Sequence, residues 1–208
     1  MNNTFQTLLI LVSLLLCFQL QSQTFSNQTN LLENTDFHSG VAMGIADMNG
    51  DGLDDIIHLD NARNLFIEYQ QLPNEAFTSY SYGSTSDKNQ WSLCIGDTDQ
   101  NGFNDVLLGG AYNNIQILNA NADATDYTSS ILPNSNIFLQ GSNFVDIDND
   151  GWIDVFACHD DDESRSYRNT ADGNFVFDNS LINTTLPSGN SGNYASIWTD
   201  YDLSLIHI

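Results

Sequence analysis

Short apolar runs alternate with polar turn residues along most of the chain, and this pattern predicts strands rather than helices. The runs are rich in β-branched and aromatic residues, and Gly, Asn, Asp and Pro separate them, as turns require. Beyond residue 23 no segment has a convincing helical periodicity. The expected strands are 41–46, 56–57, 65–69, 77–82, 93–96, 106–108, 115–118, 127–132, 144–145, 155–157, 166–168 and 175–177.

These strands recur in three units, each of which contains one acidic loop of nine residues. The loops begin at Asp47, Asp97 and Asp146, so their starts are 50 and 49 residues apart. Four short strands in a repeat of about 50 residues are typical of a β-propeller blade. The sequence therefore predicts an all-β fold, a partial β-propeller of about three four-stranded blades at about 40–90, 91–139 and 140–193, with acidic calcium loops in the hairpins.

A fourth unit begins with a strand-like run at 194–199 and a loop that opens at 200–202. The other loops have an acid or an amide and then a glycine where this one has Ser204 and Leu205. Residues 203–208 also look like the translation of a common sequencing adapter. We therefore expect 203–208 to be a non-native tail and the native protein to continue past Asp202.

The N-terminus has the pattern of an export signal. An apolar run covers 8–16, broken only by Ser13, and polar residues 19–23 follow, with Ser22 as a small residue near the expected cleavage point. The run is too short for a transmembrane helix. One feature departs from a usual export signal, because no basic residue precedes the apolar run. A lipoprotein-like signal ending at Cys17 is disfavoured by the bulky Leu16. We expect a signal peptide at 1–23, an N-terminal segment at 24–39, and a secreted or cell-surface chain with no transmembrane span.

Charge limits the partners of the protein. The formal charge is −23, from 27 acidic residues against 4 Lys and Arg. Such a chain repels phosphate backbones and anionic lipid surfaces, so nucleic acid and acidic membranes are excluded as expected partners. Many of the acids are clustered at fixed spacing, and the chain has too few basic residues to neutralise them. A divalent cation is the expected counter-charge.

The loop pattern matches the ligand chemistry of calcium, which takes six to eight oxygen atoms. Positions 1, 3 and 5 are Asp or Asn, position 6 is Gly, and position 9 is Asp in every loop. The position-7 carbonyl completes the set, and its bulky apolar side chain is expected to enter the core. The expected ligands are Asp47, Asn49, Asp51, Leu53 and Asp55 in the first loop, Asp97, Asp99, Asn101, Phe103 and Asp105 in the second, and Asp146, Asp148, Asp150, Trp152 and Asp154 in the third.

Two other interpretations of the loops are disfavoured. An EF-hand needs Glu at position 12 and flanking helices, but position 12 is His58, Leu108 and Ala157, and strands flank the loops. A single such loop could be an acidic surface turn, but three in register favour about one calcium ion per complete repeat. Magnesium prefers fewer protein ligands.

The repeats resemble FG-GAP-like repeats, also called VCBS repeats, of the integrin α N-terminal propeller superfamily. The third repeat is closest, from Asn143 to Val155, and 167–169 with 172–175 resembles a further segment of the family that the first two repeats lack. The resemblance runs from about Gly40 to Asp202. It implies a propeller, commonly of seven blades, with calcium between the first two strands of a blade, so this chain is expected to be a fragment. It also implies extracellular adhesion or ligand binding.

We expect a non-catalytic module that binds an extracellular protein or a glycan. The alternative is the propeller portion of an extracellular enzyme, such as a polysaccharide lyase or another hydrolase, whose catalytic part lies elsewhere; a purely structural role is a third. Catalytic candidates would come from His38, His58, His159 and the acidic run 160–163. No constellation of these residues is repeated, no nucleophile elbow or metalloprotease motif is present, and the acidic run is interpreted as a solvated turn.

Two cysteines remain after the expected signal, Cys94 and Cys158. A disulfide between them and two buried free thiols are both compatible with the sequence. The sequence has no CxxC motif and no Cys/His cluster, so zinc is not indicated.

Overall fold

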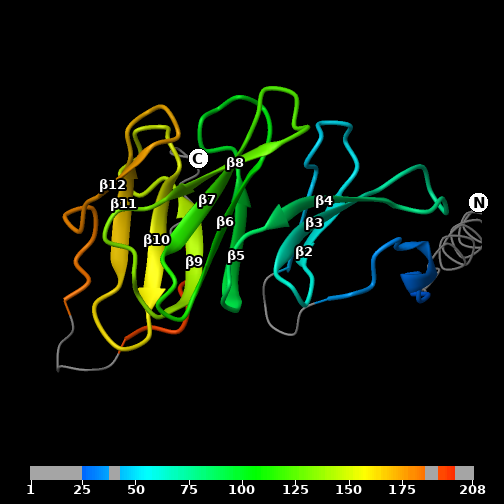
Figure 1. The fold of residues 1–208 in the computed structure, drawn as a ribbon. Helices are drawn as coiled ribbons and strands as arrows, with labels where there is room; N and C mark the ends of the chain where they lie inside the picture. The colour runs from blue at the N-terminus through cyan, green and yellow to red at the C-terminus, as the bar shows by residue number, and fades with distance from the viewer. Residues whose placement is uncertain (1–24, 38–42, 186–191, 200–208) are drawn as a thin grey trace, which may run out of the picture. The chain divides into compact units, whose positions relative to one another are not determined.

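A computed structural model describes residues 25–37, 43–185 and 192–199, and these residues form an all-β fold (Figure 1). Every strand of the described residues lies in the main unit of the chain, Leu31–Ile208. A short 3-10 helix at Thr29–Leu31 precedes them. In the described part of the chain, no helix has the length and apolar character needed to cross a membrane.

Twelve strands form three separate four-stranded antiparallel sheets, each with its strands in chain order. The first sheet contains β1 (Met43–Ala46), β2 (Asp55–Leu59), β3 (Asn64–Tyr69) and β4 (Thr78–Ser84). The second contains β5 (Gln90–Gly96), β6 (Asp105–Gly110), β7 (Ile115–Ala120) and β8 (Tyr127–Ile131). The third contains β9 (Leu139–Val145), β10 (Asp154–His159), β11 (Arg165–Asn169) and β12 (Phe175–Phe177). The predicted all-β fold of three four-stranded units is confirmed.

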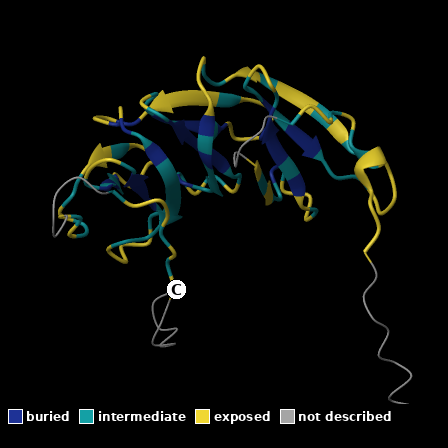
Figure 2. Ribbon diagram, turned by 90° about the horizontal axis from the view of Figure 1, so that it is seen from below, coloured by how far each residue is buried: buried dark blue, intermediate teal, exposed yellow. Residues whose placement is uncertain are grey.

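The middle strands of each sheet are buried, and the fourth strand is mostly exposed (Figure 2). Strand β6 is buried at every position, because its two faces pack into two different cores. Val106 and Leu108 belong to the core shared with the first sheet, whereas Leu107 belongs to the core shared with the third. Side chains alternate between the two faces of a strand, so successive residues of a continuous apolar run are buried in the two cores in turn.

The first strands of neighbouring sheets pack against one another, β1 against β5 and β5 against β9. Glycine permits one of these close approaches. A Cβ atom at Gly96 of β5 would lie 3.2 Å from the Phe144 ring of β9. The three sheets are therefore joined through their first strands, which places the three acidic loops that follow those strands side by side.

The predicted strand at 194–199 is wrong. Residues 192–199 have no strand in the structure, although they run along the third sheet. Asn193 donates its N–H to the His159 carbonyl oxygen at 2.8 Å, and Trp198 packs on Phe156 with ring centroids 5.4 Å apart. A strand requires a ladder with a neighbouring strand, and among the described residues this segment has none.

Cys94 and Cys158 are free thiols in the structure. Cys94 lies on β5 and its thiol donates to the Ser142 carbonyl oxygen at 2.9 Å, across the β5–β9 contact. Cys158 on β10 is fully buried, and its thiol donates to the Ser196 hydroxyl. Burial raises the pKa of both thiols. Of the two options that the sequence leaves open, the structure shows the free thiols.

Several predictions lie outside the described residues. These are the signal peptide at 1–23, His38, the partial fourth loop at 200–202 and the tail at 203–208.

Candidate metal centres

The three acidic loops connect the first and second strands of their sheets, β1–β2, β5–β6 and β9–β10. In each loop the carboxylate at position 1 accepts the backbone N–H of the glycine at position 6. The N···O distances are 2.8 Å from Gly52 to Asp47, 2.8 Å from Gly102 to Asp97 and 2.9 Å from Gly151 to Asp146. Asp and Asn side chains close turns in this way. The loop is therefore wrapped around its first side chain by the protein itself.

Position 5 adds a second turn of the same kind, because its side-chain oxygen accepts the N–H of position 7. The distances are 2.8 Å from Leu53 to Asp51, 2.8 Å from Phe103 to Asn101 and 2.9 Å from Trp152 to Asp150. The glycines between them have φ values of +83°, +93° and +91°. A Cβ at these glycines would meet no neighbour, so the backbone conformation, not lack of space, requires glycine there.

Two loops bring three carboxylates together. Oxygen atoms of Asp97, Asp99 and Asp105 lie within 4.8 Å of one another, and those of Asp146, Asp148 and Asp154 do the same. These residues occupy positions 1, 3 and 9. Ligand oxygens of a cation at about 2.3–2.6 Å have separations of this size. Each triad could therefore hold a metal ion.

The first loop differs because position 3 is Asn49, so among the described residues it has no triad of carboxylates. The position-5 side chains are not part of either triad. Of the carboxylates that the sequence singled out, the structure therefore brings together those at positions 1, 3 and 9 of the second and third loops. The amide nitrogen of Asn101 at position 5 also lies 3.3 Å from Asp99.

The aspartate at position 9 has a second role that the sequence did not reveal. It is fully buried in all three sheets and accepts one backbone N–H with each carboxylate oxygen. Oδ2 accepts from position 2 of its own loop, at 2.9 Å from Met48, 2.9 Å from Thr98 and 3.1 Å from Ile147. Oδ1 accepts from the end of the third strand, at 2.9 Å from Gln70, 2.8 Å from Ala120 and 2.9 Å from Asn169. This carboxylate therefore ties the loop to the sheet.

Burial of the position-9 carboxylates disfavours their charged form. It raises the pKa of Asp55 from 3.8 to about 6, although the N–H donors of Met48 and Gln70 partly offset the effect. Burial also raises the pKa of Asp105 and of Asp154, with the same kind of backbone donors acting against it. Without a cation, these three carboxylates are under electrostatic strain at neutral pH.

The expectation that the position-7 side chains enter the core is wrong. Leu53, Phe103 and Trp152 are half-buried and belong to neither core cluster. The Phe103 ring instead lies beside Gly50 of the first loop, where a Cβ would be 3.3 Å from it. Phe103 therefore packs between the first and second loops rather than in a core.

Side-chain amides join neighbouring loops. Asn104 in the second loop donates to the Asp47 carbonyl oxygen of the first at 2.8 Å. Gln100 in the second loop donates to the Gly151 carbonyl oxygen of the third, also at 2.8 Å. If a cation orders one loop, these hydrogen bonds therefore connect the ordered backbone to the neighbouring loops.

Arg168 on β11 forms an ion pair with Asp148, the position-3 residue of the third loop, and its Nε lies 3.1 Å from Asp178. Arg168 directly precedes Asn169, which donates to the position-9 carboxylate of the third loop. The residues that precede the equivalent donors in the second and first sheets are Asn119 and Tyr69. Of the two loops with a carboxylate at position 3, only the third therefore has an arginine paired with that carboxylate among the described residues.

We expect Arg168→Gln to strengthen binding of a divalent cation at the third loop by about fivefold, because the competing ion pair is partly exposed and contributes at most about 1 kcal/mol. Competition titration with a chelator measures this change. Arg165→Gln is the matched control, because it removes the same charge from the same strand without touching the loop. An unchanged affinity in Arg168→Gln would show that the ion pair does not compete with the cation.

Two of the three histidines named as catalytic candidates lie in the described residues, and they are buried in separate sheets. His58 on β2 is 1% exposed and its Nε2 lies 3.4 Å from Glu68. His159 on β10 is 5% exposed, and its Nδ1 accepts the N–H of Asp161 at 3.2 Å. Burial lowers the pKa of His159. The acidic run 160–163 forms the turn after β10.

A cavity of about 400 Å³ borders the first loop. Its residues are Asn49, Tyr69, Thr78, Tyr80, Tyr82, Asp123, Ala124 and Thr125. The hydroxyl groups of Tyr69 and Tyr82 are 2.6 Å apart, and the rings of Tyr80 and Tyr82 have centroids 4.8 Å apart. No sequence signal marks this cavity, because the tyrosines of the first sheet meet the turn between β7 and β8 of the second sheet only in the folded chain.

No protein-family model and no curated protein matches this chain. The comparisons therefore do not show a family for this chain, and what the structure shows is an all-β fold of three four-stranded sheets with clusters of aspartates.

Proposed function

We propose that this protein is a calcium-binding β-propeller module of the FG-GAP or VCBS type, and that it works outside the cell or on the cell surface in adhesion or ligand binding. The observation that carries this proposal is the repeated loop. Three loops at a constant spacing have the same backbone hydrogen bonds, and two of them gather three carboxylates. Backbone turns alone do not require a carboxylate at position 3, and the gathering of that carboxylate with those at positions 1 and 9 supports a shared cation.

Calcium suits these loops better than other divalent cations. The side chains at positions 1, 3, 5 and 9 offer only oxygen atoms, which hard cations prefer. Calcium accepts many protein oxygens in irregular geometry, whereas magnesium demands a near-octahedral shell and keeps several waters. The absence of cysteine and histidine from the nine-residue loops disfavours zinc.

Binding rather than catalysis fits the remaining chemistry. The two described histidines lie in different sheets and each is held by a neighbour, His58 by Glu68 and His159 by Asp161. The fold alone does not define an activity, so the proposed role is presentation of a surface that calcium keeps rigid. An extracellular protein or a glycan is the proposed ligand, because a charge of −23 opposes nucleic acids and anionic lipids.

Calorimetric titration of the full chain with calcium tests this proposal. We expect about three ions per chain, and one fewer in Asp148→Ala, because the third loop loses a triad member. Asp123→Ala, which removes an exposed carboxylate outside the loops, should leave the stoichiometry unchanged. A folded chain that binds no calcium, or a full stoichiometry in Asp148→Ala, would contradict the proposal.

A further inference from the structure

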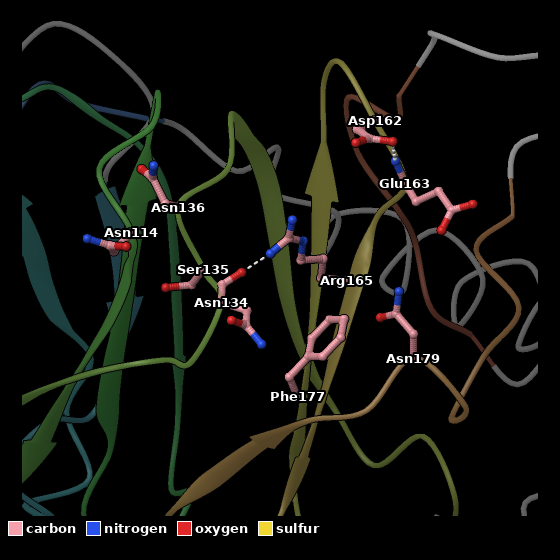
Figure 3. A pocket seen from close by; sticks show the side chains of 9 residues that line it. All are labelled: Asn114, Asn134, Ser135, Asn136, Asp162, Glu163, Arg165, Phe177 and Asn179. Atoms are coloured by element: carbon pink, nitrogen blue, oxygen red, sulfur yellow. Dashed lines mark hydrogen bonds between the residues drawn. The ribbon is translucent and has the colours of Figure 1, made fainter.

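A largely polar cavity lies between the second and third sheets, on the hairpin ends away from the acidic loops. Its volume is about 490 Å³, within the range of about 300–1,000 Å³ for small-molecule sites. Figure 3 shows Arg165 near its centre, with Asn134 and Ser135 on one side and Glu163 and Asn179 on the other. The remaining lining residues are Asn114, Asn136, Asp162 and Phe177.

Several lining groups are held in place before any ligand binds. Nη1 of Arg165 donates to the Asn134 carbonyl oxygen, and its guanidinium lies 5.7 Å from the Phe177 ring centroid. Ser135 is buried; its hydroxyl accepts the N–H of Ile115 at 3.0 Å. Asn179 accepts the N–H of Ser166 at 3.0 Å. Ordering these groups therefore costs little on binding, which favours affinity.

The lining offers both kinds of hydrogen-bonding group at close quarters. Arg165 and the side-chain amides donate, and the amide oxygens with the carboxylates of Asp162 and Glu163 accept. Phe177 adds an aromatic ring that is 39% exposed. A sugar ring has hydroxyl groups that donate and accept, and an apolar C–H face that packs on an aromatic ring. This combination matches the cavity.

The charges of the cavity select a neutral ligand. One guanidinium stands against two carboxylates, within a chain of formal charge −23. An anionic sugar would meet repulsion from Asp162 and Glu163. We propose that this cavity is a binding site for a neutral oligosaccharide. The proposal rests on the proposed ligand-binding role but not on calcium.

Saturation-transfer-difference NMR of the full chain with neutral hexasaccharides tests the site, using cellohexaose, mannohexaose, xylohexaose and chitohexaose as probes and hexagalacturonate as the anionic comparison. We expect at least one neutral probe to bind more tightly than hexagalacturonate. Phe177→Ala and Arg165→Gln should each weaken that binding about tenfold, because each removes a direct contact.

Two variants control for changes in folding and charge. Val176→Ala truncates the neighbouring residue of β12, which is 45% exposed and points to the other face of the strand. Arg63→Gln removes one positive charge outside the cavity. Both should bind within about twofold of the native chain, and thermal melts should show that all four variants fold.

Three results would overturn the site: no neutral probe bound by a folded chain, tighter binding of hexagalacturonate, or unweakened binding by both Phe177→Ala and Arg165→Gln. Calcium titration of the same samples separates this proposal from the previous one. Sugar binding without calcium binding would support the sugar site and contradict the proposed calcium sites. Calcium binding without sugar binding would support the calcium sites and contradict the sugar site.

Discussion

Asp105→Ala is expected to lower the free energy of unfolding by about 2–4 kcal/mol even when calcium is absent, because it leaves buried backbone donors without acceptors. The carboxylate accepts the N–H of Thr98 and the N–H of Ala120, and it also accepts the Thr98 hydroxyl. Relief of the unfavourable burial of the charge offsets part of the loss, since that burial raises the pKa of Asp105. Urea unfolding in excess chelator measures the change.

Asp99→Ala is the matched control, because Asp99 belongs to the same triad but bonds only within the loop, to Asn101. It should remove the proposed calcium ion of the second loop and change the stability of the calcium-free chain by less than about 1 kcal/mol. Equal destabilisation by the two substitutions would show that position 9 does not tie the loop to the sheet.

Saturating calcium at pH 7 is expected to give the largest effect on stability. A site occupied at 100 times its dissociation constant adds about 2.7 kcal/mol, so three proposed sites together add about 8 kcal/mol. Because the chain of −23 charge has little internal counter-charge, much of this gain comes from relief of carboxylate repulsion. Thermal melts with calcium and with chelator, at equal ionic strength, measure the difference.

The pH dependence of the calcium-free chain follows from the position-9 carboxylates. A carboxylate whose folded pKa is raised contributes stability below its unfolded pKa, and this contribution disappears as pH rises through the folded pKa. For Asp55 the window runs from 3.8 to about 6, and the raised pKa values of Asp105 and Asp154 act in the same direction. Without calcium, we therefore expect stability to fall between pH 4 and pH 7.

Calcium should reverse that slope, because it binds only the deprotonated carboxylates and so binds more tightly as pH rises. The lowered pKa of Asp60 contributes stability that is lost only below its ordinary value, outside this window. The lowered pKa of His159 makes stability rise with pH up to its ordinary value of 6.5, but this is one group against three carboxylates. Melting curves at several pH values, with calcium and with chelator, test both slopes. A calcium-free chain that becomes more stable from pH 4 to pH 7 would contradict the assignment of strain to these carboxylates.

The loop geometry could be predicted from the sequence because it depends on local conformation. Glycine at position 6 and Asp or Asn at positions 1 and 5 specify turns within a few residues, and all three loops adopt those turns. Twelve strands were predicted in their correct order for the same reason: apolar runs bounded by turn residues are a local signal.

Features that depend on contacts between distant residues could not be predicted. The dual role of Asp105 requires the end of β7, fifteen residues further along the chain, to reach its second oxygen. The pairing of Arg168 with Asp148 and the placement of Phe103 against Gly50 both join separate strands or loops. The strand expected at 194–199 failed because a strand needs a neighbouring strand, which a local pattern does not reveal.

By itself, the sequence determined the all-β class, the three repeats and the side chains that offer oxygen atoms to a cation, since each is encoded within one repeat. Only the tertiary structure decided which of those oxygens meet, which carboxylate is buried, and that polar residues of two sheets enclose the cavity around Arg165. The physical reason is that distances across a sheet or between sheets depend on how strands pack, and packing is a property of the whole chain.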